Sequence, residues 1–240
     1  MDANHLAKHL RSALEHEPRV NLHRDRVEVQ LMDGVATVTG EVDDIAGKRR
    51  TLELAASLLP VNGIVDRLHV RPVEPMGDGA IADHVEQALL RDSAFDECSL
   101  YRKVRGAREK VRTAADTSWW IEVGVEDGVV TLDGEVPSLS HKRFAGVLAW
   151  WVPGCRDVVN GLGVEPAEDD NDLEILDALR IVLEKDPLVD ASQVTASAHD
   201  AVVTLDGFVA SEASRHAAEY DAWALFGVDD VVNRIRVQGD

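Results

Sequence analysis

Hydrophobic and polar residues alternate with a period of two in three separate stretches of the chain, and each stretch ends at a tight-turn signal. A period of two is the pattern of a strand with one buried face. Asp-Gly supplies the positive φ that a type I′ hairpin turn needs. The third turn has Ala201 in place of glycine, so we expect it to be of another type or mildly strained. The stretches are Val27, Val29 and Leu31 before Asp33-Gly34; Ile121, Val123 and Val125 before Asp127-Gly128; and Val194, Ala196 and Ala198 before Asp200-Ala201.

Each turn is followed, at the same spacing, by a second strand, a helical stripe and a third strand. The helices end at Pro60, Gly154 and Gly227. A strand, a helix and a strand in succession imply a right-handed crossover with the helix on one face of the sheet. The stripes are Ile45, Leu52, Ala55, Ala56 and Leu59; Leu139, Val147, Leu148 and Trp151; and Ala218, Ala222 and Leu225; the closing β-branched runs are 61–70, 158–164 and 228–237.

A further amphipathic helix precedes each hairpin. The sequence therefore predicts an α+β fold of three tandem repeats, residues 1–73, 79–165 and 170–238, each a helix-strand-strand-helix-strand module with two helices packed on a three-stranded mixed sheet. Modules of roughly 70 residues are marginal alone, so we expect them to pack on one another. The first helices carry Leu6, Leu10, Ala13 and Leu14; Ile81, Val85, Ala88 and Leu89; and Ile175, Leu179, Val182 and Leu183.

The middle copy is about twenty residues longer than the others, and the excess falls at about 101–118. This insertion is basic, because its six cations against Glu109 and Asp116 give +4 and leave −23 for the rest of the chain. Two interpretations stay open: a loop that folds over the protein's own acidic surface, or an anion-binding arm. The cations are Arg102, Lys103, Arg105, Arg108, Lys110 and Arg112.

Four of the five tryptophans also belong to the middle copy. Alternation sends Trp119 and Trp120 to opposite faces of the strand, so one of them should face away from the helices, where an aromatic side chain favours contact with another domain or subunit. These two residues complete the candidate binding set with the six cations. Trp150 and Trp223 occupy equivalent helix positions, which indicates packing between modules.

Other candidate groups favour structural interpretations. Cys98 and Cys155 fit buried reduced thiols, with a disulfide as the alternative. Three pairs of basic residues recur near the start of the second helix, and we interpret them as a solvated helix face. They are Lys48-Arg49, Lys142-Arg143 and Arg215-His216.

The sequence offers no support for catalysis. It has no Gly-rich phosphate loop, no Gly-x-Ser-x-Gly elbow and no Cys-x-x-Cys pair, so we expect no catalytic residues and no cofactor. His5 and His9 have the spacing of two metal ligands, but no third ligand or adjacent Glu base follows, and no metal site is predicted.

The net charge of −19 disfavours contact with nucleic acid and with anionic lipid headgroups. No apolar run reaches the length of a membrane span, so no transmembrane segment is expected. The segment Met1 to Leu14 is amphipathic and lacks the apolar core of a signal peptide. The chain as given is expected to be cytoplasmic.

The third copy shows most plainly a pattern that resembles the BON domain, a family that includes osmotically inducible bacterial proteins. The resemblance rests on Asp186-Pro187, on the run from Val202 to Gly207 and on the run from Gly227 to Val237. It covers nearly the whole chain as three tandem copies. It implies a non-enzymatic binding module, often periplasmic, linked to osmotic stress and proposed to contact phospholipid or envelope components, with some relatives responding to potassium.

These observations favour a binding or scaffolding protein linked to osmotic or envelope stress, acting through contacts with proteins or envelope components. The alternatives are a phospholipid-binding or potassium-responsive protein and, less favoured, a hydrolase with a cleft between modules. The middle copy, with its insertion and tryptophans, is the predicted docking site for a partner protein or a second copy of the chain.

Overall fold

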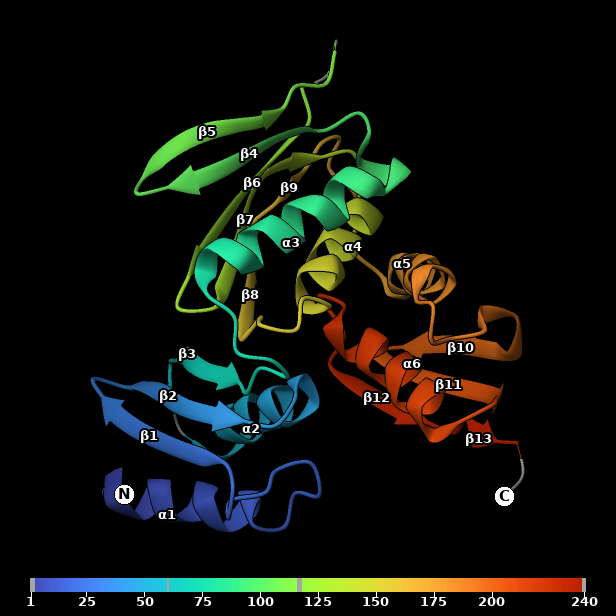
Figure 1. Ribbon diagram of the computed structural model, residues 1–240. Helices are drawn as coiled ribbons and strands as arrows, with labels where there is room; N and C mark the ends of the chain where they lie inside the picture. Colours follow the sequence, from blue (N-terminus) through green and yellow to red (C-terminus); the bar gives the residue numbers. More distant parts are fainter. Residues whose placement is uncertain (1–2, 60, 116–117, 239–240) are drawn as a thin grey trace. The chain divides into compact units, whose positions relative to one another are not determined.

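The computed structural model describes residues 3–59, 61–115 and 118–238, without the side chains of residues 3–6. Pro60 and the side chains of His5 and Leu6, which the sequence patterns include, lie outside this description. The chain divides into two compact units, residues 1–72 and 73–240 (Figure 1). Module 1 forms the first unit, and modules 2 and 3 form the second.

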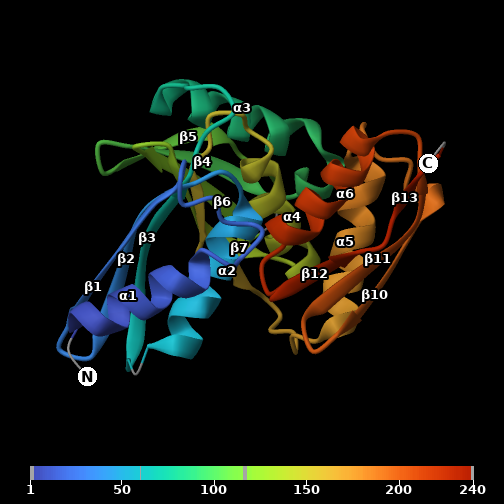
Figure 2. The same cartoon turned by 90° about the horizontal axis from the view of Figure 1, so that it is seen from below.

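Module 1 has the predicted order of elements. β1 and β2 are antiparallel and β2 and β3 are parallel, so the sheet is mixed, with β2 in the centre. The two helices pack on each other and against the sheet (Figure 2). The elements are α1 (Ala3–Leu14), β1 (Arg26–Met32), β2 (Val35–Val42), α2 (Ile45–Leu58) and β3 (Gly63–Val70).

Module 3 repeats this arrangement with a central β11 that is antiparallel to β10 and parallel to the third strand. The third strand is in two short pieces rather than one. The elements are α5 (Asp172–Lys185), the 3-10 turn η2 (Ala191–Gln193), β10 (Val194–His199), β11 (Val202–Val209), α6 (Glu212–Ala224), β12 (Asp230–Asn233) and β13 (Arg236–Val237).

Module 2 has a larger sheet than the three strands predicted. Its strand order is β5-β4-β6-β7-β8, and β9 also pairs with β7. The insertion expected as a loop at about 101–118 instead supplies most of two strands, and its residues 116 and 117 lie outside the description. The elements are α3 (Asp78–Arg91), the 3-10 turn η1 (Ser93–Phe95), β4 (Ser99–Val104), β5 (Ala107–Arg112), β6 (Trp120–Glu126), β7 (Val129–Val136), α4 (Leu139–Trp150), β8 (Asp157–Asn160) and β9 (Gly163–Val164).

An asparagine that bonds to the second helix lies at the break in the third strand of modules 2 and 3. Asn160 Oδ1 accepts a hydrogen bond from Leu162 N at 3.3 Å, and its Nδ2 donates to the backbone oxygen of Lys142 on α4 at 2.7 Å. Asn233 makes the same two kinds of bond. Such local bonds compete with the ladder of the sheet. In module 1 the equivalent residue is Asp66, which accepts the same local bond from Leu68 N at 2.9 Å but has no N–H to donate to the helix, and β3 continues unbroken through it.

All three hairpin turns have the same left-handed conformation. The φ angles are 51° and 78° at Asp33-Gly34, and 49° and 61° at Asp200-Ala201. The prediction for the third turn is therefore resolved: it keeps the type I′ geometry, and Ala201 takes the strain of a positive φ.

A carboxylate at the start of the preceding helix holds this turn in modules 2 and 3. Asp172 accepts hydrogen bonds from the backbone N–H groups of Asp200 and Ala201, at 3.0 and 2.9 Å. Asp78 does the same for Asp127 and Gly128, at 3.1 and 2.9 Å. These bonds fix the first helix of the module to its hairpin, a link that the repeat pattern did not predict.

The glycine in the second strand of each hairpin has a packing role that fixes its identity. Gly134 has a φ of 142°, and a Cβ added there would lie 2.0 Å from the backbone oxygen of Trp120. Gly40 and Gly207 have the same conformation and the same close approach to the first strand. This recurrence explains why glycine stands at one offset in every copy.

Modules 2 and 3 pack through their helices, as the equivalent tryptophans predicted. α4 lies against both α5 and α6. Trp151 Nε1 donates to Asp221 Oδ1 at 2.9 Å, and the hydroxyl of Tyr220 donates to the backbone oxygen of Trp150 at 3.0 Å. Trp150 and Trp223 are both buried. Burial raises the pKa of Asp221 to about 8, and the nearby carboxylate of Asp186 adds to the shift.

Two of the three basic pairs of the second helices are not the solvated face that we expected, whereas the third matches the expectation, with Arg215 half-buried and His216 exposed, both near Glu212. Arg143 is fully buried, and it donates to the backbone oxygen of Phe226 at 2.8 Å and to Asp170 at 2.6 Å. Lys48 is buried as well, with its Nζ 2.9 Å from Asp66. The expectation failed because helix position alone does not show which neighbouring module or strand covers a side chain.

Candidate binding surface on module 2

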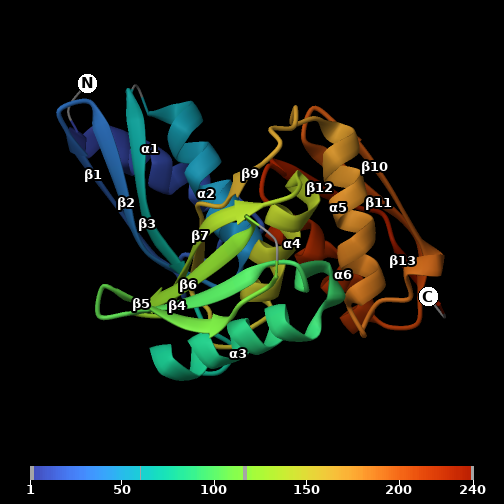
Figure 3. The same ribbon diagram turned by 90° about the horizontal axis from the view of Figure 1, so that it is seen from above.

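The basic insertion of module 2 forms a β-hairpin that we call the basic hairpin, residues 99–112. Arg105 and Gly106 make its turn, with φ angles of 50° and 81°. β4 runs parallel to β6, with Ser99 opposite Trp120 and Arg102 opposite Val123, and β5 is the outermost strand (Figure 3). The hairpin is therefore an extension of the sheet with a fixed register, not a mobile arm.

On the side of the helices, the hairpin is anchored by Arg102 and Leu100. Arg102 Nη2 lies 2.7 Å from Glu86 Oε2 on α3, and the guanidinium also pairs with Asp83. The hydrogen bond with Glu86 is the main cause of the raised pKa of Arg102. Leu100 is 2% exposed. β4 thus closes the space between α3 and β6.

On the opposite side of β6 from the core residues, an arginine lies between two aromatic rings. The guanidinium carbon of Arg108 is 4.1 Å from the ring centroid of Trp120 and 5.1 Å from that of Tyr101. The same guanidinium pairs with Glu122, which is buried. The two rings meet edge to face at 6.3 Å. These cation–π contacts and the ion pair hold β5 against the sheet.

Arg112 secures the end of the hairpin. Its Nη2 donates to the backbone oxygens of Cys98, at 3.0 Å, and of Phe95. A carboxylate of Asp96 lies 3.8 Å from its Nη1. Three of the six cations, Arg102, Arg108 and Arg112, therefore have their partners within module 2.

The other three cations face solvent. Lys103, Arg105 and Lys110 are exposed, and within the described part of the chain none of them makes a hydrogen bond or an ion pair. The self-covering interpretation thus describes half of the insertion, and anion binding stays a prediction for the other half, which is exposed. The candidate set missed Tyr101 and Glu122; their positions opposite each other on adjacent strands become visible only with the register.

The two neighbouring tryptophans do not form one surface. Trp120 belongs to the cluster around Arg108, whereas Trp119 precedes β6 and its Nε1 donates to the backbone oxygen of Glu165 at 3.3 Å. Both are half-buried. The structure therefore separates Trp119 from the rest of the predicted binding set.

The remaining reactive groups are enclosed. Cys98 and Cys155 are buried free thiols, and burial raises the pKa of Cys98 to about 11. No group of three His, Cys, Asp or Glu side chains in the described ranges is arranged to hold a metal ion. Among the helices that the structure describes, none combines the length and the apolar character of a membrane span.

Comparison with solved structures finds two of CdsD, a structural protein of the type III secretion system of Chlamydia trachomatis. One is its C-terminal domain, 14% identical, with 99% of each chain covered and a TM-score of 0.24. The other is 15% identical, with 99% of this chain and 92% of that chain covered, and has the same TM-score. No curated protein matches the sequence.

The family model of the BON domain matches three regions, residues 2–72, 104–166 and 171–239. The matched regions correspond to the three modules, and the match in module 2 begins only at the end of β4. Together they cover most of the chain. The protein therefore belongs to the BON domain family and consists of three BON domains in tandem.

Proposed function

We propose that the protein is a non-enzymatic binding and scaffolding protein that docks an acidic protein surface through the basic hairpin of module 2. Such a surface can belong to a partner protein or to a second copy of this acidic chain. A role in osmotic or envelope stress, as the family resemblance implies, is part of this proposal.

The observation that carries the proposal is that the hairpin cations form two sets, one with partners inside module 2 and one exposed. Arg102, Arg108 and Arg112 hold the hairpin rigid, while Lys103, Arg105 and Lys110 remain exposed. A rigid cationic edge on a chain of net charge −19 is complementary to the rest of the chain's own surface. Lysine on an edge strand also opposes pairing of that edge with its own copy, which favours side-chain contact over strand pairing.

The test combines a charge reversal with a matched control. A triple variant with Lys103→Glu, Arg105→Glu and Lys110→Glu should lose self-association measured by light scattering, or lose binding to an acidic partner. The wild-type association should also weaken as salt rises. The control reverses three exposed cations away from the hairpin, Arg67, Arg180 and Arg234. Equal association of the two variants and wild type would refute docking through the hairpin.

Phospholipid contact is the second candidate, because the same three cations could face anionic headgroups. Its test is co-sedimentation of wild type and the hairpin triple variant with phosphatidylglycerol vesicles at low salt. If wild type binds the vesicles and the triple variant does not, the hairpin binds a lipid surface rather than a protein partner. The overall negative charge leads us to expect no sedimentation.

A further inference from the structure

Module 1 has an open groove where module 2 has a strand. The groove has a volume of about 480 Å³ and lies between α1 and β1. Its apolar lining includes Leu10, Leu14, Val27 and Val29. In module 2 the corresponding space, between α3 and β6, is closed by β4, with Leu100 buried in it.

The backbone of β1 is open along the same edge. Over the residues that the structure describes, β1 pairs with β2 and with no other strand. Its equivalent in module 2, β6, pairs with β7 on one side and β4 on the other. Unpaired N–H and C=O groups on an edge strand are a template for an added strand.

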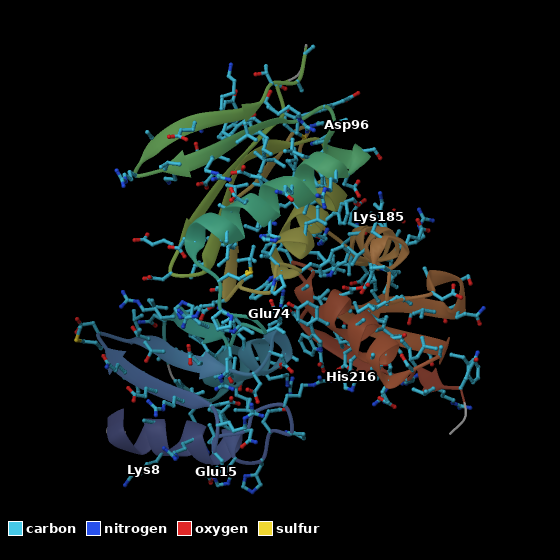
Figure 4. All side chains as sticks on the ribbon, in the orientation of Figure 1. Lys8, Glu15, Glu74, Asp96, Lys185 and His216 are labelled. Atoms are coloured by element: carbon cyan, nitrogen blue, oxygen red, sulfur yellow. The ribbon has the colours of Figure 1, made fainter. Side chains whose placement is uncertain are left out.

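The charges beside the two grooves are opposite. The repeat places Lys8 and Arg11 of α1 where α3 has Asp83 and Glu86, the two acids that bind Arg102. Lys8 and Arg11 line the groove and are exposed, and Figure 4 labels Lys8 on α1. A strand bound in module 1 would therefore need an acidic residue where β4 has Arg102.

A buried carboxylate marks one end of the groove. Asp25 lines it and is 4% exposed; its Oδ2 accepts from Asn21 N at 2.8 Å, but its Oδ1 has no hydrogen-bond donor. Arg71 is near that oxygen, at 3.8 Å. In module 2 the equivalent residue is Trp119, whose backbone oxygen accepts from Ser99 N at the start of β4. Asp25 thus occupies the place where an incoming strand would begin.

We propose that the groove of module 1 binds an extended segment of an acidic partner protein, added as a strand parallel to β1. An apolar side chain would fill the groove as Leu100 does in module 2, and an Asp or Glu two residues later would face Lys8 and Arg11. The basic hairpin of a second copy does not fit, because its Arg102 would face two cations. This surface is separate from the one on module 2.

Two blocked peptides test the inference on the full-length protein. One has the sequence of residues 99–104, and the other carries Arg102→Glu within it. Amide chemical shifts are followed by NMR up to about 1 mM peptide, the weak end of specific binding. The Arg102→Glu peptide should shift amides of α1 and β1 and bind about tenfold more tightly than the peptide with Arg102, a difference of about 1.4 kcal/mol. Absence of binding, or shifts outside module 1, would overturn the proposal.

A charge swap on α1 makes the test specific. The double variant Lys8→Glu and Arg11→Glu should reverse the preference, so that the basic peptide binds more tightly. Both side chains are exposed, so the variant should fold. The matched control, Lys103→Glu with Lys110→Glu, should keep the wild-type preference. An unchanged preference in the α1 variant would refute the inference and leave docking through module 2 untouched.

Discussion

Apart from the inserted β4 and β5 and the divided third strand, modules 1 and 2 share one succession of elements and one register around the hairpin, yet the outer edge of the first strand differs completely between them. In module 2 the edge is covered by β4, whereas in module 1 the described part of that edge is bare. The charges change together with the covering strand: Asp83 and Glu86 face Arg102 in module 2, and Lys8 and Arg11 stand at these positions in module 1. The comparison shows how about twenty inserted residues cover an edge that is open in module 1.

The largest expected effect is on the pH dependence of stability. It contrasts two buried carboxylates, Asp221 in residues 73–240 and Asp25 in residues 1–72. Burial raises the pKa of Asp221 to about 8 from an ordinary value of 3.8, so the folded state holds a proton that the unfolded state releases. The contribution of the Asp221 carboxyl to the stability of the folded state is complete below about pH 4 and is lost as the pH rises through about 8. Between pH 5 and 8 the loss is about 4 kcal/mol, at most about 1.4 kcal/mol per pH unit.

Asp221→Asn tests this, because the amide keeps an acceptor for Trp151 Nε1 and cannot ionise. The stability of the variant relative to wild type, measured by thermal unfolding, should increase from pH 5 to pH 8. Asp25→Asn is the comparison in module 1, where burial also raises the pKa but a bond from Asn21 N opposes the shift. Its gain at pH 8 should be smaller. Parallel pH profiles for wild type and Asp221→Asn would contradict the assignment.

The next effect concerns the covering strand. Arg102→Ala leaves Glu86 buried without its cation, and we expect a loss of about 2 kcal/mol in the free energy of unfolding. Arg11→Ala changes the α1 position that is equivalent to Glu86. It should lower the free energy of unfolding by no more than about 0.5 kcal/mol, because the ion pair of Arg11 with Glu15 is exposed. Urea unfolding of both variants measures the contrast. Equal costs would show that the ion pair does not hold β4 in place.

The smallest effect concerns the third turn, where module 3 departs from the other two. Ala201→Gly removes the strain of a φ of 61° and should stabilise the protein by about 0.5–1 kcal/mol. Gly128→Ala introduces the same strain in module 2 and brings a Cβ within 2.8 Å of Arg156 Cδ, so it should destabilise. Opposite shifts in melting temperature are expected. A destabilised Ala201→Gly variant would contradict the strain argument.

The sequence was a reliable guide wherever the relevant contacts are local. Alternation and Asp-Gly turns predicted the hairpins, and the recurring glycines mark a backbone contact that admits no Cβ. The equivalent positions of Trp150 and Trp223 predicted packing between modules. In each case the requirement is repeated in neighbouring residues or in successive copies, so it is visible as a pattern.

The candidate surface was predictable in composition but not in form. The six cations were identified, yet the turn at Arg105-Gly106 was not recognised, and the insertion was expected to be a loop. Glycine between runs containing Leu100, Val104 and Val111 was the signal for a hairpin. Its weakness is physical, because β5 is an edge strand with exposed residues and has little hydrophobic alternation.

By itself the sequence determined the three modules, the order of elements that they share and their membership of one family, because turn chemistry and periodicity act over a few residues. Only the tertiary structure decided which cations are exposed to solvent and which form ion pairs or hydrogen bonds within the protein. Arg143 is enclosed by module 3, and Arg108 is exposed but held by Trp120 and Glu122, while Lys103 has neither kind of partner. The reason is that burial of a charge depends on partners distant in the chain, and a one-residue change in strand register would exchange those partners.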